Sequence, residues 1–183
     1  MIELNRSHLV DTLTERLRTT ESPRQRIMLE RMREHAAAER DGDLETLIGT
    51  LGPETAYHFW ELSGDVGPKG RDGVAAYYTH LVENNGHVLE FHCETLVVDD
   101  NCIVIEGELT MIQPGALLME HPMASSFADA AKTYLLKMRN VIFWRFDADL
   151  MIIAEDSYSG GPMELRELSD EELPADFRAL LPR

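Results

Sequence analysis

The chain has 183 residues, 44% of them hydrophobic, and carries a formal net charge of -16. This length suits one domain with its own core. Such acidity argues against a protein that binds nucleic acid or an anionic membrane, since both need Lys and Arg to neutralise phosphate. The two cysteines, Cys93 and Cys102, make no disulfide framework, and no apolar run suits a membrane span or signal peptide. We therefore expect a cytoplasmic protein.

Helical patterns dominate the first 53 residues. Apolar residues at helical spacing predict a first helix over 4–19. Ser22 followed by Pro23 predicts the start of a second helix that runs to about Asp41, because the serine hydroxyl can cap it and proline fits the first helical position. One stripe of this helix holds Met28, Met32, His35, Ala36 and Glu39. A short third helix follows Asp43 and is broken by Gly52 and Pro53.

The middle of the chain alternates between strand and helix patterns. Residues 55–62 predict a strand, and a fourth helix is expected after Gly70 and Asp72, closing at about Asn84. Two strands follow at about 88–98 and 103–113. The segment 114–131 is too long for a plain hairpin loop, and its apolar residues Leu117, Leu118, Met119, Met123 and Phe127 indicate that it packs as a lid, a binding loop or extra helices.

The stretch 133–159 predicts two long strands joined by a turn at 147–149. Strict alternation gives one face with Met138, Asn140, Ile142, Trp144 and Phe146 on the first strand, then Ile152, Ala154, Asp156 and Tyr158 on the second. The opposite face carries Lys137, Arg139, Arg145 and Glu155. We expect its three basic residues to meet the acids of the two preceding strands. A carboxylate on an apolar face is costly unless it is paired, protonated or used, so Asp156 is the leading candidate for chemistry.

This order of elements predicts an α+β fold: a cone-shaped, strongly curved, mainly antiparallel sheet with helices packed on its concave face, a cystatin-like roll. Such a cone commonly encloses a pocket. We expect a single domain over 1–183, in which 1–21 is an extra N-terminal helix, 22–160 is the core and 161–183 is a C-terminal helical tail. Within the tail, Ser169 and Glu172 form a capping box for a last helix.

Three segments carry a resemblance to the nuclear-transport-factor-2-like superfamily and its SnoaL-like group. They are AERDGDLETLIGTL, FWELSGDVGPKGRDGVAAYY and RFDADLMIIAEDSY, in the order and at the spacing of that superfamily. It includes ketosteroid isomerases, polyketide cyclases, dehydratases, epoxide hydrolases and modules that only bind, so the fold does not decide the function.

The resemblance also implies site residues. The position of the steroid isomerase base corresponds to Glu61, and that of the oxyanion-stabilising tyrosine corresponds to His35. The second oxyanion donor corresponds to Ile142, so half of that oxyanion hole is missing. SnoaL-type cyclases resemble this chain in carrying an acid on the last strand, and the matching residue is Asp156.

We therefore expect Asp156, Glu61 and His35 as catalytic candidates, each of which could instead be a structural residue. The candidates for substrate binding are Tyr57, Asn140, Tyr158, Trp144, Met32 and Phe59. Glu90, His92 and Glu94 could form a metal site or could belong to a charged outer face of the sheet. We favour the outer face, and we expect neither a metal nor another cofactor.

Two functions stay open at this point. The first is an enzyme that moves a proton on a small, apolar, oxygen-bearing molecule, giving isomerisation, cyclisation or dehydration. The second is a non-catalytic small-molecule-binding or dimeric interaction module. A homodimer is expected in either case, because family members often pair through the outer sheet face and the terminal helices need a surface to cover.

Overall fold

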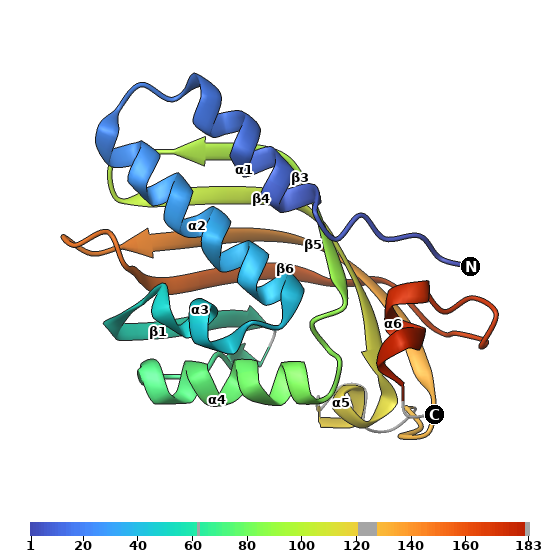
Figure 1. Cartoon of the computed structure of the whole chain (residues 1–183). Coiled ribbons are helices and arrows are strands. Elements are labelled where there is room, and N and C mark those ends of the chain that lie inside the picture. Colours follow the sequence, from blue (N-terminus) through green and yellow to red (C-terminus); the bar gives the residue numbers. More distant parts are fainter. Residues whose placement is uncertain (62, 121–127, 182–183) are drawn as a thin grey trace.

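The computed structural model describes residues 1–61, 63–120 and 128–181. A six-stranded sheet has the order β2-β1-β6-β5-β4-β3 (Figure 1). The strands are β1 (Leu51–Glu61), β2 (Gly64–Asp65), β3 (Leu89–Val98), β4 (Cys102–Pro114), β5 (Thr133–Phe146) and β6 (Ile152–Glu167). All neighbouring strands are antiparallel except β1 and β6, which are parallel. The predicted curved, mainly antiparallel α+β fold is confirmed.

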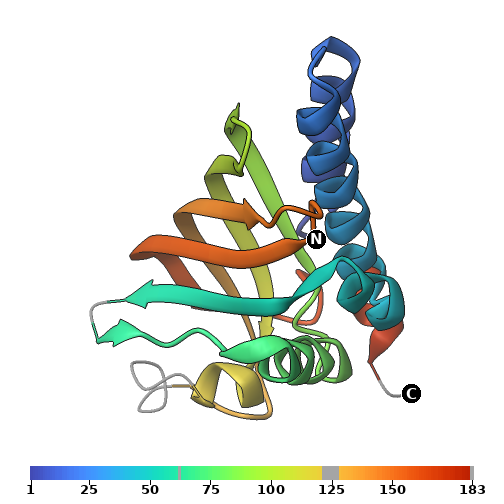
Figure 2. The ribbon, with the colours of Figure 1, turned by 90° about the vertical axis from the view of Figure 1, so that its left-hand side faces the viewer.

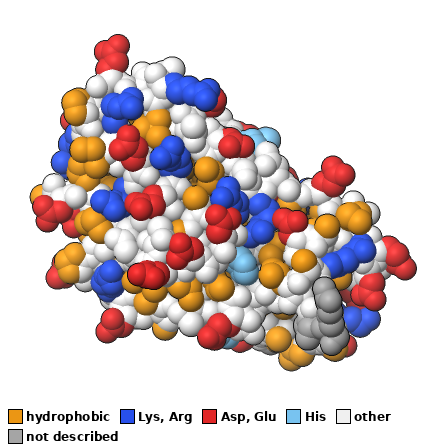
Figure 3. All heavy atoms as spheres, viewed as in Figure 1, with side chains coloured by type: hydrophobic (Ala, Val, Ile, Leu, Met, Phe, Trp, Pro, Cys, Tyr) orange, Lys and Arg blue, Asp and Glu red, His pale blue; other side chains and the backbone are white. Residues whose placement is uncertain are grey.

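Helices cover one side of this sheet, as Figures 1 and 2 show. They are α1 (His8–Thr19), α2 (Pro23–Asp41), α3 (Leu44–Gly49) and α4 (Gly70–Glu83), with the short α5 (Gly115–Glu120) and α6 (Ala175–Leu180) at one end. The main core lies between α1, α2, α4 and the concave side of the sheet. Acidic and basic side chains are interspersed over the outward side of the helices (Figure 3). No helix in the described ranges is long and apolar enough to cross a membrane.

The predicted helix boundaries follow from local chemistry. The Ser22 hydroxyl accepts a hydrogen bond from the backbone N–H of Gln25 at 3.5 Å, and Pro23 is the first residue of α2. Gly42 ends the helix with a φ of 71°, a left-handed conformation that suits glycine. These signals lie within a few residues of each other, so they can be recognised without knowing the tertiary structure.

Two sequence expectations at strand ends were wrong. The third helix ends at Gly49, before Gly52 and Pro53, but these two residues lie inside β1, which begins at Leu51 instead of residue 55. A register shift against β6 between Leu51 and Ala56 means that the proline need not donate a ladder hydrogen bond. β6 continues to Glu167, well beyond residue 160, where the tail was expected to begin.

The tail forms a second small core. Leu168, Leu173 and Phe177 are buried with Val88, Ile112 and Leu135, and Ile2 and Leu4 pack against them. Ser169 and Glu172 do interact through the Ser169 backbone N–H at 3.0 Å, but they close a turn and α6 begins only at Ala175. Phe177 of α6 is therefore covered by the chain itself, as are Leu13 and Leu17 of α1, whereas Leu180 of α6 stays 42% exposed.

In the 114–131 segment, α5 buries Leu117 and Leu118, in agreement with the expected packing. Met123 and Phe127 lie outside the described residues.

The β5–β6 hairpin contains the irregularity that matters most for function. Phe146 pairs with Ile152, whereas Arg145 pairs with Ala154, so Ile153 is an extra residue on β6. A one-residue bulge moves every following side chain to the opposite face. Beyond it, Glu155 pairs with Trp144, Ser157 with Ile142 and Ser159 with Asn140. The expectation that Asp156 and Tyr158 share a face with Trp144 and Ile142 was therefore wrong.

Candidate functional site

A cavity of about 300 Å³ lies between α2, α4 and the concave side of the sheet. Its walls are mostly apolar and aromatic, with contributions from Met32, Phe59, Tyr77, Tyr78, Phe91, Ile105, Leu109, Ile142 and Trp144. The polar residues that line it are Glu39, Glu61, Asn140, Glu155, Ser157 and Ser159. A largely apolar cavity with few polar groups is the usual form of a small-molecule site.

Two carboxylic acids face this cavity from opposite walls. Glu39 lies on α2, about one turn beyond His35, and Glu155 lies on β6 opposite Trp144. Both side chains are only partly exposed, and because both line the cavity we attribute the exposed surface to the cavity wall. Burial raises the pKa of Glu39 to about 7. Burial also raises the pKa of Glu155 well above its usual value, with further contributions from the negative charges of Glu39 and Asp156.

Two residues that line the cavity each have a buried polar atom that lacks a partner among the described residues. The indole Nε1–H of Trp144 and the side-chain Oδ1 of Asn140 make no hydrogen bond within the described part of the chain. Their residues are only 3% and 7% exposed, so bulk solvent does not satisfy them. Buried polar groups are normally hydrogen-bonded, so these two atoms are available to a bound molecule.

Behind the cavity wall, His35 is part of a hydrogen-bond chain. Its Nδ1 lies 2.8 Å from the hydroxyl of Thr50, and that hydroxyl donates to the carbonyl of Leu47 at 2.6 Å. The Thr50 oxygen must then accept from Nδ1–H, which leaves Nε2 as an acceptor for the Tyr78 hydroxyl at 3.0 Å. Tyr78 in turn accepts from the hydroxyl of Tyr57 at 3.3 Å.

Every polar N–H and O–H of this hydrogen-bond chain is already donated to an acceptor. Burial lowers the pKa of His35 to about 3, so the imidazole is neutral near pH 7. His35 does not line the cavity, and its two ring nitrogens are both occupied. The network therefore holds α2 and α4 against the sheet, and the geometry gives His35 no direct role in moving a substrate proton.

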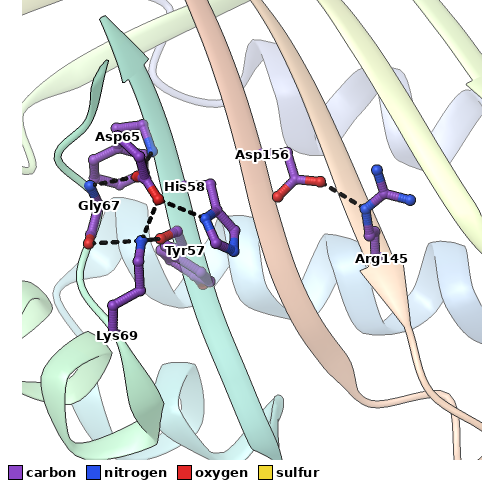
Figure 4. Close-up of polar contacts among 8 residues, drawn as sticks. Tyr57, His58, Asp65, Gly67, Lys69, Arg145 and Asp156 are labelled. Carbon is purple, nitrogen blue, oxygen red and sulfur yellow. Dashed lines mark hydrogen bonds and ion pairs between the residues drawn. The ribbon is translucent and has the colours of Figure 1, made fainter. Parts of the chain in front are cut away.

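Asp156 lies on the outer side of the sheet, where its carboxylate accepts a hydrogen bond from Nε of Arg145 at 2.6 Å (Figure 4). Next to it on β1, His58 contacts Asp65 at 2.6 Å, and Lys69 contacts the same carboxylate oxygen at 2.8 Å. Hydrogen bonds from Lys69 and His58 lower the pKa of Asp65. This row of ion pairs is separated from the cavity by the sheet itself.

Tyr158 is also on the outer side, where its ring stacks on Trp60 with a centroid separation of 6.3 Å. Of the acids considered for a metal site, Glu94 pairs with Arg139 at 3.0 Å, as expected, whereas Glu90 accepts a hydrogen bond from the backbone N–H of Asn5 at 2.8 Å. Nearby, Lys137 pairs with Glu108 at 3.2 Å. No group of three or more His, Cys, Asp or Glu side chains is arranged for a metal ion among the described residues.

No family model matches the sequence, and no curated protein is significantly similar to it. The fold, in contrast, matches many solved structures. A protein from Jannaschia sp. CCS1 described as a SnoaL-like polyketide cyclase is 18% identical, with a TM-score of 0.58 over 78% of this chain and 91% of that chain. A protein from Burkholderia pseudomallei described as NTF2-like is 16% identical, with a TM-score of 0.50 over 73% and 90% of the two chains.

The chain has the nuclear-transport-factor-2-like fold. An epoxide hydrolase/cyclase-like enzyme, described as acting in pyran ring formation in the polyether salinomycin, also shares this fold, with 11% identity and a TM-score of 0.52 over 73% of this chain and 90% of that chain. At these identities the comparison establishes the SnoaL-like architecture alone.

Within this nuclear-transport-factor-2-like cone, the predicted site residues divide into three groups. Glu61, Asn140, Trp144, Met32 and Phe59 line the cavity. Tyr57 and His35 lie behind its wall, in the hydrogen-bond chain. Asp156 and Tyr158 are on the outer side of the sheet.

Sequence reasoning missed the two acids that line the cone with raised pKa values. Glu39 was visible on the apolar stripe of the second helix, and an acid on such a stripe is the same signal that singled out Asp156. Glu155 was assigned to the wrong face, because alternation was carried through the bulge at Ile153. The run of five apolar residues from Leu150 to Ala154 interrupts the alternation and is the signal in the sequence that could have indicated the bulge.

Proposed function

We propose that the protein is an enzyme that moves a proton next to a carbonyl group of a small, largely apolar molecule bound in the cone. The observation that carries this proposal is the pair Glu39 and Glu155, two carboxyl groups facing one apolar cavity with raised pKa values. Pairs of acids whose environments shift their pKa values are the usual basis for dividing acid and base roles.

Glu39 is assigned as the general base. With a pKa of about 7 it is partly ionised near neutral pH, and a base is most effective when its pKa lies close to the working pH. Its carboxylate takes a proton from the carbon next to the carbonyl group. The electron pair of the broken C–H bond forms a carbon–carbon double bond, and the carbonyl oxygen becomes an enolate oxygen.

Glu155 and Trp144 are assigned to that oxygen. They are cross-strand partners that face the same cavity, and the pKa of Glu155 favours its protonated form, so its O–H can donate a hydrogen bond. The unpartnered indole N–H of Trp144 can donate a second one. Two donors aimed at a developing oxyanion in a site of low polarity are an effective form of transition-state stabilisation.

The enolate can then react in three ways. Return of the proton to a different carbon gives isomerisation, attack on a second carbonyl carbon gives cyclisation, and loss of a hydroxyl group from the β-carbon gives dehydration. All three use the same first step, so that step is the one to test.

The test follows exchange of the methyl hydrogens of acetylbiphenyl in D2O by proton NMR. We expect the protein to accelerate exchange, and we expect Glu39→Gln to lower the catalysed rate by about 10²-fold. Glu155→Gln keeps a hydrogen-bond donor, so its catalysed exchange rate should fall less than that of Glu155→Leu. The matched control is Glu108→Gln, which removes an acid that pairs with Lys137 on the outer side of the sheet and should leave the exchange rate unchanged.

Equal exchange rates for the wild type and Glu39→Gln would overturn the assignment of the base. Binding of the ketone without any acceleration of exchange would favour the alternative, a module that only binds small molecules.

A further inference from the structure

The second unpartnered atom, Oδ1 of Asn140, lies away from the proposed reaction centre. Asn140 and Trp144 are on the same face of β5 and both line the cavity. Four residues of strand separate them by roughly 13 Å. Ile142 lies between them on that face, and the cavity there is also lined by Ile105 and Leu109.

The cavity thus has polar groups near Trp144 and near Asn140, and between them mainly apolar side chains with Ser157 opposite Ile142. At the Trp144 end the available groups are the donors of Glu155 and the indole. At the other end, Ser159 pairs with Asn140 across the strands, and its hydroxyl already donates to the sulfur of Met138 at 3.5 Å. The Oδ1 of Asn140 is therefore an acceptor that has no donor among the described residues.

The charges on the cavity wall are of one sign. Glu39, Glu61 and Glu155 line it, and none of the described lining residues is Lys, Arg or His. No basic group offsets an anionic ligand there, and a carboxylate or phosphate would lose its hydration without a compensating partner. The cavity therefore disfavours anions.

We infer that the substrate is an elongated carbonyl compound without anionic groups, with a hydrogen-bond donor roughly 10 Å along the molecule from its carbonyl oxygen, because the hydrogen bonds at the two ends take up part of the distance between the residues, and that Asn140 is the residue that selects for this donor. A hydroxyl group is the simplest donor of this kind. A site with a buried unpaired acceptor discriminates strongly against a ligand that cannot satisfy it, because the acceptor then stays desolvated and unpaired. The inference rests on the proposed carbonyl site for the orientation of the ligand, but it does not require catalysis.

The test uses acetylbiphenyl derivatives that carry different groups at the far para position. Their equilibrium binding is measured by quenching of tryptophan fluorescence and confirmed by calorimetry. The hydroxyl derivative should bind at least about tenfold more tightly than its methoxy analogue, because only the hydroxyl can donate to Oδ1. The carboxylate derivative should bind at least about tenfold more weakly than the methoxy analogue.

The variants Asn140→Leu and Asn140→Ala remove the acceptor, one with a side chain of similar size and one with a smaller side chain. In either variant that folds, the preference for hydroxyl over methoxy should fall to about one. Equal binding of the hydroxyl and methoxy derivatives to the wild type would overturn the inference, and so would an unchanged preference in a folded variant. Tight binding of the carboxylate derivative would overturn the exclusion of anions.

The same measurements in Glu39→Gln separate this inference from the proposed catalysis. That variant should keep the preference for the hydroxyl derivative even though exchange is lost. A protein that shows the preference but never exchanges hydrogens would retain the inference and contradict the proposed function.

Discussion

Glu155 and Asp156 are consecutive residues of β6 whose side chains lie on opposite sides of the sheet. Glu155 faces the cavity opposite Trp144, whereas Asp156 forms an ion pair with Arg145 on the outer side. The bulge at Ile153 decides which of the two acids enters the cone. The strand register therefore determines the chemistry of the cavity as much as the residue types do.

The ion pair of Asp156 should contribute to stability. The Asp156 side chain is 11% exposed and that of Arg145 is 54% exposed. Because the pair is only partly buried, we expect Asp156→Asn to lower the free energy of unfolding by about 1 kcal/mol, measured by urea denaturation at pH 7. The control is Glu164→Gln, which breaks an ion pair with Arg166 that is 40% exposed on both sides and should cost less. A larger loss of stability for Glu164→Gln than for Asp156→Asn would contradict this prediction.

Glu39 should make stability depend on pH. Its pKa is about 7 in the folded protein and 4.5 ordinarily, so the folded state binds more protons between these values and stability falls as the pH rises through this window. We expect Glu39→Gln to raise the free energy of unfolding by about 1–3 kcal/mol at pH 8 and to change it little at pH 4.5. Denaturation of both proteins across this range checks the prediction, and a stabilisation that is the same at both pH values would refute it.

His35 should be neutral and locked in one tautomer. With a pKa of about 3, the imidazole should remain neutral at pH 5, with its single ring proton on Nδ1. Nitrogen NMR of labelled imidazole distinguishes the two tautomers and the charged form. Observation of an imidazolium at pH 5 would contradict the hydrogen-bond chain.

His35 also gives a pH dependence of opposite sign. Since its pKa is lowered from 6.5, the stability it contributes is complete above that value and is lost as the pH falls towards 3. We expect a folded His35→Gln variant to lose less stability than the wild type between pH 6.5 and 4.5. An equal loss of stability in both proteins over this pH range would show that His35 is not the group responsible for the pH dependence.

The homodimer stays a prediction. The structure weakens one reason for expecting it, because Leu13 and Leu17 of α1 and Phe177 of α6 are buried within the chain, although Leu180 of α6 is 42% exposed. It leaves the outer side of the sheet with exposed Trp60 and Tyr158, which are 42% and 47% exposed. If a second copy covers this side, sedimentation velocity at micromolar concentration should show a dimer that Tyr158→Glu converts to monomer. A wild-type protein that sediments only as a monomer would contradict the expectation.

Much of the fold could be predicted because its signals are local. Ser22 with Pro23, Gly42, the pattern of α4 and the β5–β6 turn each depend on a few neighbouring residues. Their order was enough to predict a curved sheet with helices on one side. The end of β6 and the start of α6 were misplaced, because both depend on how the tail packs against Val88 and Ile112.

The site was less predictable than the fold. Helix periodicity correctly placed His35 next to the sheet, but its role depends on Thr50, Tyr78 and Tyr57, which are brought to it only by folding. The bulge at Ile153 reverses the sides of Glu155 and Asp156, and no turn residue marks it in the sequence. Periodicity predicts which residues alternate, but it does not locate the position at which alternation is interrupted.

The most direct test of the account is a titration of the side-chain carboxyl carbons by NMR, assigned with the Glu39→Gln, Glu155→Gln and Asp156→Asn variants. We predict that Glu39 titrates near pH 7, that Glu155 titrates well above 4.5, and that Glu39→Gln lowers the pKa of Glu155 because it removes the neighbouring charge. Titration of both glutamates near 4.5, with no effect of one substitution on the other, would contradict a desolvated, interacting pair in the cone.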